Sequence, residues 1–79
     1  MTMDILLFAG LAEAAGSPRL ELDGPLPRTA AELESEVRER WPALAAMPFR
    51  VAVNQAYAGA ETLVGASDEI ALIPPVGGG

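Results

Sequence analysis

The chain ends in the stretch Glu69-Ile70-Ala71-Leu72-Ile73-Pro74-Pro75-Val76-Gly77-Gly78-Gly79. Its first part, Glu69 to Ile73, is a strand-like apolar run that ends at two prolines. Proline has no N–H for a central ladder, and two in a row favour an extended polyproline II segment. The stretch therefore predicts a last strand over residues 69–73, followed by an extended tail over residues 74–79.

The end of the tail has no bulky side chains, because its last three residues are glycines. When fully extended, Val76 to Gly79 would reach about 13 Å. Three glycines have no side chain that would stop a narrow channel from closing around the backbone. This pattern favours a tail that offers the α-carboxylate of Gly79 as a reagent. A triple-glycine end is by itself also typical of a frayed terminus or a cloning remnant. Fraying does not explain why an apolar strand runs directly into Pro-Pro.

The first half of the chain predicts two strands and a helix. Met3 to Phe8 is an apolar strand, and its continuous run Ile5-Leu6-Leu7-Phe8 predicts burial on both faces. One helical turn over 11–15, ended by Gly16, leads to a second strand over 19–22. The clearest local signal follows, because Thr29 and Glu32 have the spacing of a capping box.

The helix that begins at Thr29 presents an apolar face and a charged face. Leu33, Val37 and Trp41 recur at spacings of four, and Pro42 ends the pattern. Pairs of Glu and Arg at i,i+4 occupy the other side: Glu34 with Arg38, and Glu36 with Arg40. These charges are explained as a solvated helix face and are given no catalytic role.

Three more strands are expected after the helix. They cover 50–53, 62–64 and 69–73, with a turn at Asn54-Gln55. The order β-β-α-β-β-β suits an α+β fold with a mixed sheet and one main helix packed across it. Because the first and last strands are the most apolar, we place them side by side in the centre. This is the β-grasp, or ubiquitin-like, architecture over residues 1–73.

The composition excludes several classes of function. The 79 residues include no Cys, no His and no Lys, which removes disulfides, thiolate and imidazole metal sites, and Cys or Lys nucleophiles. A net charge of −6 argues against nucleic acid as a partner. No apolar run approaches the length of a membrane span, and no basic signal segment precedes the first strand. We expect a cytoplasmic protein that is not an enzyme on its own and binds no metal or permanent cofactor.

Three stretches of the sequence resemble one family. They are Ile5-Leu6-Leu7-Phe8-Ala9, Val51-Ala52-Val53-Asn54-Gln55, and the end of the chain from Asp68. Together they resemble the molybdopterin synthase small subunits, which are MoaD-like, ubiquitin-like sulfur carriers. The family ends in Pro-Pro-Val, one variable residue and Gly-Gly, and Gly77 holds the variable position here.

The resemblance implies a reaction at Gly79. An E1-like activating enzyme would use ATP to convert the Gly79 carboxylate into a transient acyl-adenylate. A sulfur donor would then displace AMP and leave a thiocarboxylate. The tail Pro74, Pro75, Val76, Gly77, Gly78 would enter the large subunit of molybdopterin synthase, in an expected heterotetramer, and give sulfur to a pterin precursor.

The resemblance also implies a docking surface made by Phe8, Tyr57 and Ile73, although Phe8 is open to a second interpretation as a core residue. Two alternatives to the molybdopterin role stay open. One is a β-grasp sulfur carrier for thiamine, tRNA thiolation or cysteine synthesis. The other is an interaction module with an inert tail.

Overall fold

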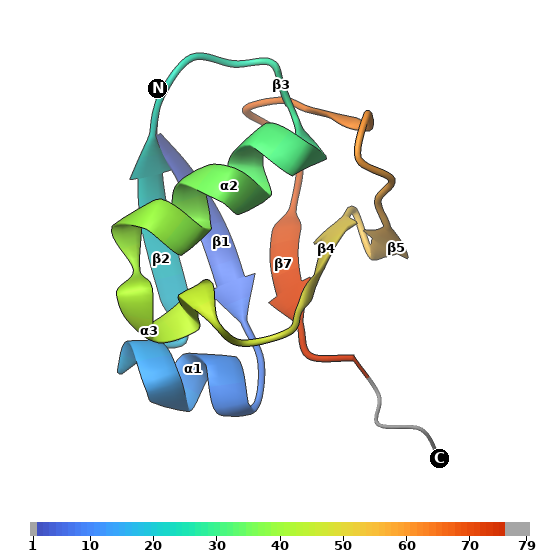
Figure 1. The fold of residues 1–79 in the computed structure, drawn as a ribbon. Coiled ribbons are helices and arrows are strands. Elements are labelled where there is room, and N and C mark those ends of the chain that lie inside the picture. The colour runs from blue at the N-terminus through green and yellow to red at the C-terminus, as the bar shows by residue number, and fades with distance from the viewer. Residues whose placement is uncertain (1, 76–79) are drawn as a thin grey trace.

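The main sheet places the first and last strands at its centre (Figure 1). The computed structural model describes residues 2–75. Five strands lie in the order β2-β1-β7-β4-β5, and β1 and β7 run parallel while the other neighbours are antiparallel. Their bounds are β1 Thr2–Leu7, β2 Arg19–Asp23, β4 Arg50–Val53, β5 Ala56–Tyr57 and β7 Ile70–Ile73. The predicted α+β, β-grasp arrangement is confirmed.

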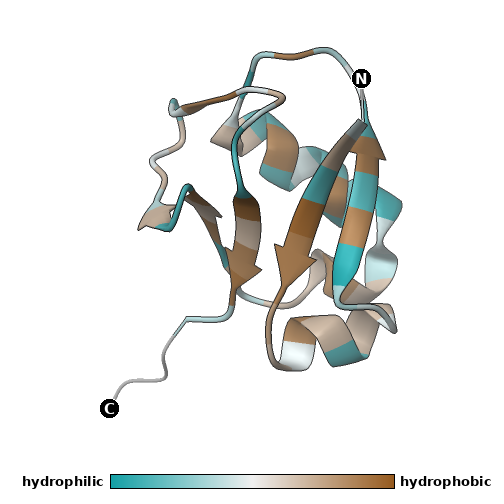
Figure 2. Cartoon of the chain, turned by 180° about the vertical axis from the view of Figure 1, so that it is seen from behind, coloured by the Kyte–Doolittle hydropathy of each residue, from teal (hydrophilic) through white to brown (hydrophobic). Residues whose placement is uncertain are grey.

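The helices lie on one side of this sheet (Figure 1). They are α1 Gly10–Ala15, α2 Ala30–Arg40 and α3 Pro42–Ala45. Figure 2 shows the opposite face of the sheet, which the described residues leave without a helix. Among residues 2–75 no helix is long and apolar enough to cross a lipid bilayer.

The core lies between the sheet and the helices. Strand residues of alternate positions point into it, and Leu33 and Val37 of α2 and Leu44 of α3 meet them. Ile5 and Leu7 of β1 are buried there, whereas Leu6 is half-buried and Phe8 is 48% exposed. The prediction that Ile5 to Phe8 is buried on both faces is therefore wrong. The reason is that helices cover β1 on one side only.

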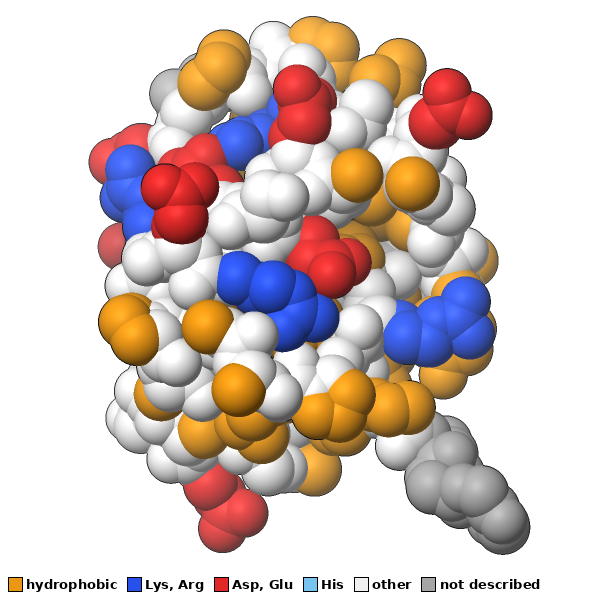
Figure 3. Space-filling view, viewed as in Figure 1, with side chains coloured by type: hydrophobic (Ala, Val, Ile, Leu, Met, Phe, Trp, Pro, Cys, Tyr) orange, Lys and Arg blue, Asp and Glu red, His pale blue; other side chains and the backbone are white. Residues whose placement is uncertain are grey.

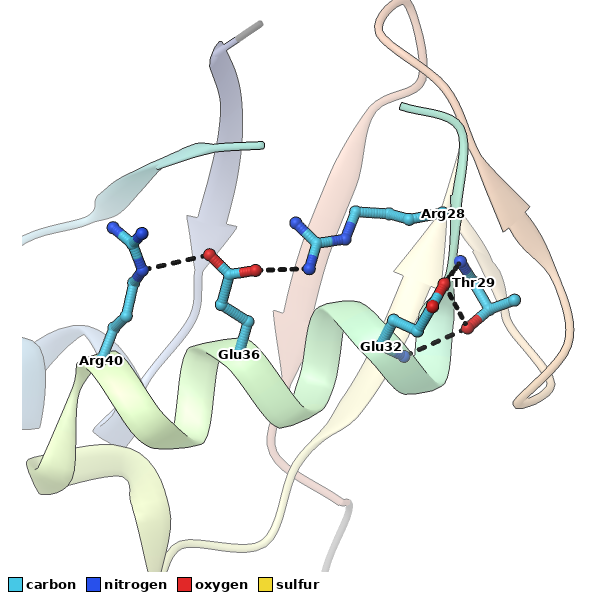
Figure 4. A network of polar contacts seen from close by, with 5 residues as sticks. All are labelled: Arg28, Thr29, Glu32, Glu36 and Arg40. Carbon is cyan, nitrogen blue, oxygen red and sulfur yellow. Dashed lines mark hydrogen bonds and ion pairs between the residues drawn. The ribbon is translucent and has the colours of Figure 1, made fainter. Parts of the chain in front are cut away.

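The start of α2 is fixed by the predicted capping box (Figure 4). The backbone N–H of Glu32 donates to Thr29 Oγ1 over 3.1 Å, and the Thr29 N–H donates to Glu32 Oε1 over 2.8 Å. The predicted pair of Arg38 Nε with Glu34 Oε2 is present at 3.2 Å. Trp41 follows the helix and is half-buried against the core. The sequence pattern thus gave the bounds and both faces of this helix correctly.

Two very short strands were not predicted. Arg28–Thr29 forms β3 and Ala56–Tyr57 forms β5, each of two residues. The strand expected over 62–64 is β6, Leu63–Val64, and it pairs with β3 in a separate two-stranded sheet instead of joining the main one. Alternation of apolar and polar residues cannot be recognised over two positions, so only the three-dimensional pairing shows these elements.

The turn between β4 and β5 is tied to the loop that precedes β7. Asn54 and Gln55 have φ of 52° and 68°, which is the left-handed region that a tight two-residue hairpin requires at both positions. The Asn54 side chain donates to Asp68 Oδ1 and accepts from the Glu69 N–H, each over 2.9 Å. Asp68 Oδ2 in turn accepts from the Gly65 N–H over 2.7 Å. These bonds fix the entry of the chain into β7.

Replacing Thr29 by Ala should destabilise the protein by about 1 kcal/mol, because the Glu32 N–H at the start of α2 then loses its acceptor. Urea denaturation followed by circular dichroism measures this. Ser35→Ala is the matched control, since Ser35 is an exposed residue in the middle of the same helix. Equal stability of the Thr29→Ala and Ser35→Ala variants would contradict the capping role.

The free energy of unfolding should decrease at acid pH because the carboxylates of Glu32 and Asp68 become protonated. Hydrogen bonds from the Thr29 backbone and side chain lower the pKa of Glu32. Hydrogen bonds from the Gly65 backbone and the Asn54 side chain lower the pKa of Asp68. A lowered pKa in the folded state means that the stabilisation is complete above the ordinary pKa values of about 4 and is lost as pH falls through the lowered ones. Denaturation curves between pH 6 and pH 2 should show a shallower loss of stability in Asp68→Asn; an identical slope would refute the role of Asp68.

Candidate functional site

The open face of the main sheet carries a row of apolar side chains. In the strand register Leu6 of β1 lies opposite Ala71 of β7, Ala71 lies opposite Ala52 of β4, and Ala52 lies opposite Tyr57 of β5. Directly paired residues project from the same face of a sheet, so these four side chains cross it in one line. Because Ala52 and Ala71 in the middle of this row have short side chains, the surface is recessed there.

A hollow of about 390 Å³ opens over this row. It is lined by Leu6, Phe8, Ala52, Gln55, Glu69, Ala71 and Ile73. Phe8 follows the end of β1 and Ile73 is the last residue of β7, so both lie at the end of the sheet from which the chain continues into Pro74 and Pro75. Pro74 is half-buried and Pro75 is exposed. The hollow therefore adjoins the base of the tail.

The structure brings two of the three predicted docking residues together. Phe8 and Ile73 line the hollow, and Phe8 is exposed instead of filling the core. Tyr57 does not line it; its side chain is 52% exposed at the edge, on the far side of Ala52. The tail residues Val76, Gly77, Gly78 and the predicted reactive residue Gly79 lie outside the described residues.

Sequence reasoning missed most of the residues that line the hollow. Leu6 and Ala71 could have been found, because they alternate with the core residues of their strands and so must face the other side. Gln55 and Glu69 depend on the pairing of the hairpin with β7, which no local pattern shows. Their polar groups border an otherwise apolar surface.

The next row of the sheet is acidic. Asp4 lies opposite Glu21 of β2, and Glu69 directly precedes β7 on the same side as Ala71. Arg19 reaches Asp4 only at 3.9 Å, between two well-exposed side chains, and such a pair adds little stability. The open face is thus apolar near the tail and acidic toward the other end of the sheet, and Glu69 lies at the boundary between the two parts.

A larger hollow on the charged side of α2 is explained by the fold. It is lined by residues of opposite charge, which Figure 3 shows mixed over the helix. Glu36 accepts a hydrogen bond from Arg28 and forms an ion pair with Arg40 over 3.0 Å, so the three side chains link β3 to the middle and the C-terminal end of α2 (Figure 4). Because both arginines are paired with the carboxylate of Glu36, this surface has a structural explanation.

Metal chemistry finds no support in residues 2–75. No group of three or more Asp, Glu, His or Cys side chains there could hold an ion. The apolar hollow offers only one carboxylate, from Glu69. Its other lining residues are apolar except for the amide of Gln55.

Comparison with known proteins identifies the family. The sequence pattern of the ThiS family matches residues 5–79. The molybdopterin synthase sulfur carrier subunit of Arabidopsis thaliana is 35% identical over 77 residues, which cover 95% of this chain and 80% of that protein.

Solved structures agree with the fold. SAMP1 of Haloferax volcanii superimposes with a TM-score of 0.83 at 31% identity and covers both chains completely. A putative molybdopterin converting factor subunit 1 from Pyrococcus furiosus gives 0.84 at 20% identity, over 96% of this chain and 99% of that one. The latter supports the fold alone. The chain therefore belongs to the ThiS family and is a homologue of the molybdopterin synthase sulfur carrier subunits.

Proposed function

We propose that this chain carries sulfur as a thiocarboxylate on Gly79 and delivers it to a pterin precursor, as the small subunit of a molybdopterin synthase. The observation that carries the proposal is the position of the hollow. A largely apolar hollow lies directly beside the base of a tail that ends in Pro-Pro-Val-Gly-Gly-Gly. The kinship with the Arabidopsis carrier subunit supports it.

The tail supplies the reacting group and its partners supply the catalysis. A carboxylate is a poor electrophile. An E1-like adenylating enzyme would therefore join the Gly79 carboxylate to the AMP part of ATP and release pyrophosphate. A sulfur donor would then displace AMP and leave the thiocarboxylate. No Cys, His or Lys in this chain could perform these steps, so we expect no turnover by the chain alone. Because activation consumes ATP, the proposal places the carrier in the cytoplasm.

The expected partner for discharge is the large subunit of molybdopterin synthase. A Helicobacter pylori structure is described as a complex of subunits 1 and 2 of molybdopterin-converting factor, and this chain superimposes on it with a TM-score of 0.69 at 21% identity. In the proposed complex the docking surface is the hollow together with Tyr57. It would hold the carrier body while the tail reaches the reaction site. A heterotetramer of two carriers and two large subunits is the expected assembly.

A second function is favoured by one comparison. SAMP1 of Haloferax volcanii, named a small archaeal modifier protein, matches the full length of this chain at 31% identity. A modifier would use the same activated Gly79, but an amine of a target protein would take the place of the sulfur donor. The two functions differ in the product at the C-terminus, which mass spectrometry separates. Carriers for other sulfur pathways differ only in the acceptor.

Incubation with the activating enzyme, ATP and a sulfide source should raise the intact mass of the chain by about 16 Da, the exchange of one oxygen for sulfur. Adding the large subunit and the pterin precursor should return the carboxylate form. Deleting Gly79 should abolish the shift because the carboxylate then stops short of ATP. The matched control is Leu63→Ala, since Leu63 is an exposed residue of β6 outside the main sheet.

Sulfur transfer by the chain that lacks Gly79 would refute the mechanism. If the thiocarboxylate forms but does not transfer its sulfur to the pterin precursor, the chain is a sulfur carrier whose acceptor belongs to another pathway. Amide-linked adducts on other proteins, with no thiocarboxylate, would favour the modifier function.

Replacing Phe8 by Asp should weaken binding of the large subunit more than tenfold, because a charge would then be buried in an apolar interface. Tyr57→Asp should act in the same direction. Both side chains are about half exposed in the free chain, at 48% and 52%, so the fold should survive. Titration calorimetry gives the affinity and circular dichroism checks the fold.

Leu63→Asp is the control for these variants, since Leu63 is 63% exposed yet lies in the separate two-stranded sheet. A loss of affinity in Leu63→Asp, with Phe8→Asp unchanged, would place the interface elsewhere.

A further inference from the structure

Arg50 stands beside the base of the tail, and we propose that it receives a carboxylate of the partner protein at the edge of the docking surface. The inference rests on the proposed function, because it assumes that a partner covers the hollow. It adds the chemistry of one contact to that interface. The partner would present an Asp or Glu side chain next to the channel that takes the tail.

The strand register fixes where Arg50 lies. In the β4–β7 pairing it is directly opposite Ile73, the residue before Pro74. Arg50 and Ala52 are two positions apart on β4 and so project from the same face, and Ala52 is opposite Tyr57. Arg50 is thus next to a residue that lines the hollow and next to the tyrosine at its edge.

The side chain is held in place by an aromatic ring. The guanidinium carbon of Arg50 lies 4.3 Å from the centroid of the Tyr57 ring, within the range of a cation–π interaction. Stacking leaves the edge of the guanidinium free to donate, because the ring contacts only its planar face. It also restricts the side chain before binding, so less conformational entropy is lost when a partner docks.

Arg50 differs from the other arginines in its charge partners. Arg28 and Arg40 both pair with Glu36, Arg38 pairs with Glu34, and Arg19 approaches Asp4. Arg50 has no ion pair with any residue in the range 2–75. The protein has a net charge of −6, yet Arg50 is a positive charge that no carboxylate among residues 2–75 pairs with.

Charge complementarity then indicates the sign of the partner. A carboxylate fits the planar guanidinium fork in a bidentate pair, which a basic or neutral group cannot form. Figure 3 shows basic atoms beside hydrophobic ones at the edge of the molecule that carries β4 and β5. Arginine and tyrosine next to an apolar patch are also the residue types that dominate binding energy at protein interfaces.

The test uses the full chain and, as the binding partner, the molybdopterin synthase large subunit of the source organism. Titration calorimetry at several salt concentrations gives Kd and its salt dependence. Arg50→Gln should weaken binding by about tenfold and flatten the salt dependence, and Arg50→Glu should weaken it further. Arg40→Gln is the matched control, because Arg40 is an exposed arginine on α2, on the other side of the sheet.

Three results separate this inference from the proposed function. Unchanged affinity and salt dependence in both Arg50 variants, with binding lost in Phe8→Asp, would overturn the role of Arg50 and leave the docking surface in place. Tighter binding by Arg50→Glu would also overturn it, since the partner would then present a cation. A chain that binds no large subunit at all would overturn the proposed function and this inference with it. Thermal melting of each variant confirms that the fold is kept.

Discussion

The parallel pairing of β1 with β7 is the contact on which the architecture depends. It joins residues more than sixty positions apart in sequence, with Ile5 opposite Ile70 and Leu7 opposite Leu72. A parallel pair cannot be closed by a short turn, so everything between the two strands has to form the crossover. That requirement places α2 across one face of the sheet. The end of β7, and therefore the base of the tail, lies in the middle of the sheet instead of at its edge.

A sheet covered on one side only has consequences for its free face. Here the residues nearest the tail on that face are apolar or small, and the hollow lies over Ala52 and Ala71. Farther along β1 and β2 the face is acidic, with Asp4 opposite Glu21. A surface with both parts can be soluble when free and can still bury an apolar patch when a partner docks. The hollow adjoins the base of the tail because Ile73, the last residue of β7, is one of its lining residues.

The sequence predicted the parts of this fold that depend on local patterns. The capping box at Thr29, the alternation of Leu20 and Leu22 in β2, and Gly16 after α1 each have a short-range physical cause. The central position of β1 beside β7 was also predicted, from the apolar character of both terminal strands. The two-residue strands β3 and β5 were missed because their pairing arises only when distant segments meet. The family resemblance pointed to Phe8 and Ile73 as docking residues, whereas Gln55 and Glu69 reach the hollow only through the pairing of distant segments.

The composition of the chain fits the chemistry proposed for its end. An activated carboxyl group reacts with any amine or thiolate that reaches it, and a long tail could bring it back to the body of its own molecule. This chain has no lysine and no cysteine, and its basic residues are five arginines. The guanidinium stays protonated at neutral pH and does not act as a nucleophile. Arginine can therefore supply positive charge for docking, as at Arg50, without competing for the activated Gly79. Lysine at the same position would provide both the charge and an amine that could attack an activated carboxyl group.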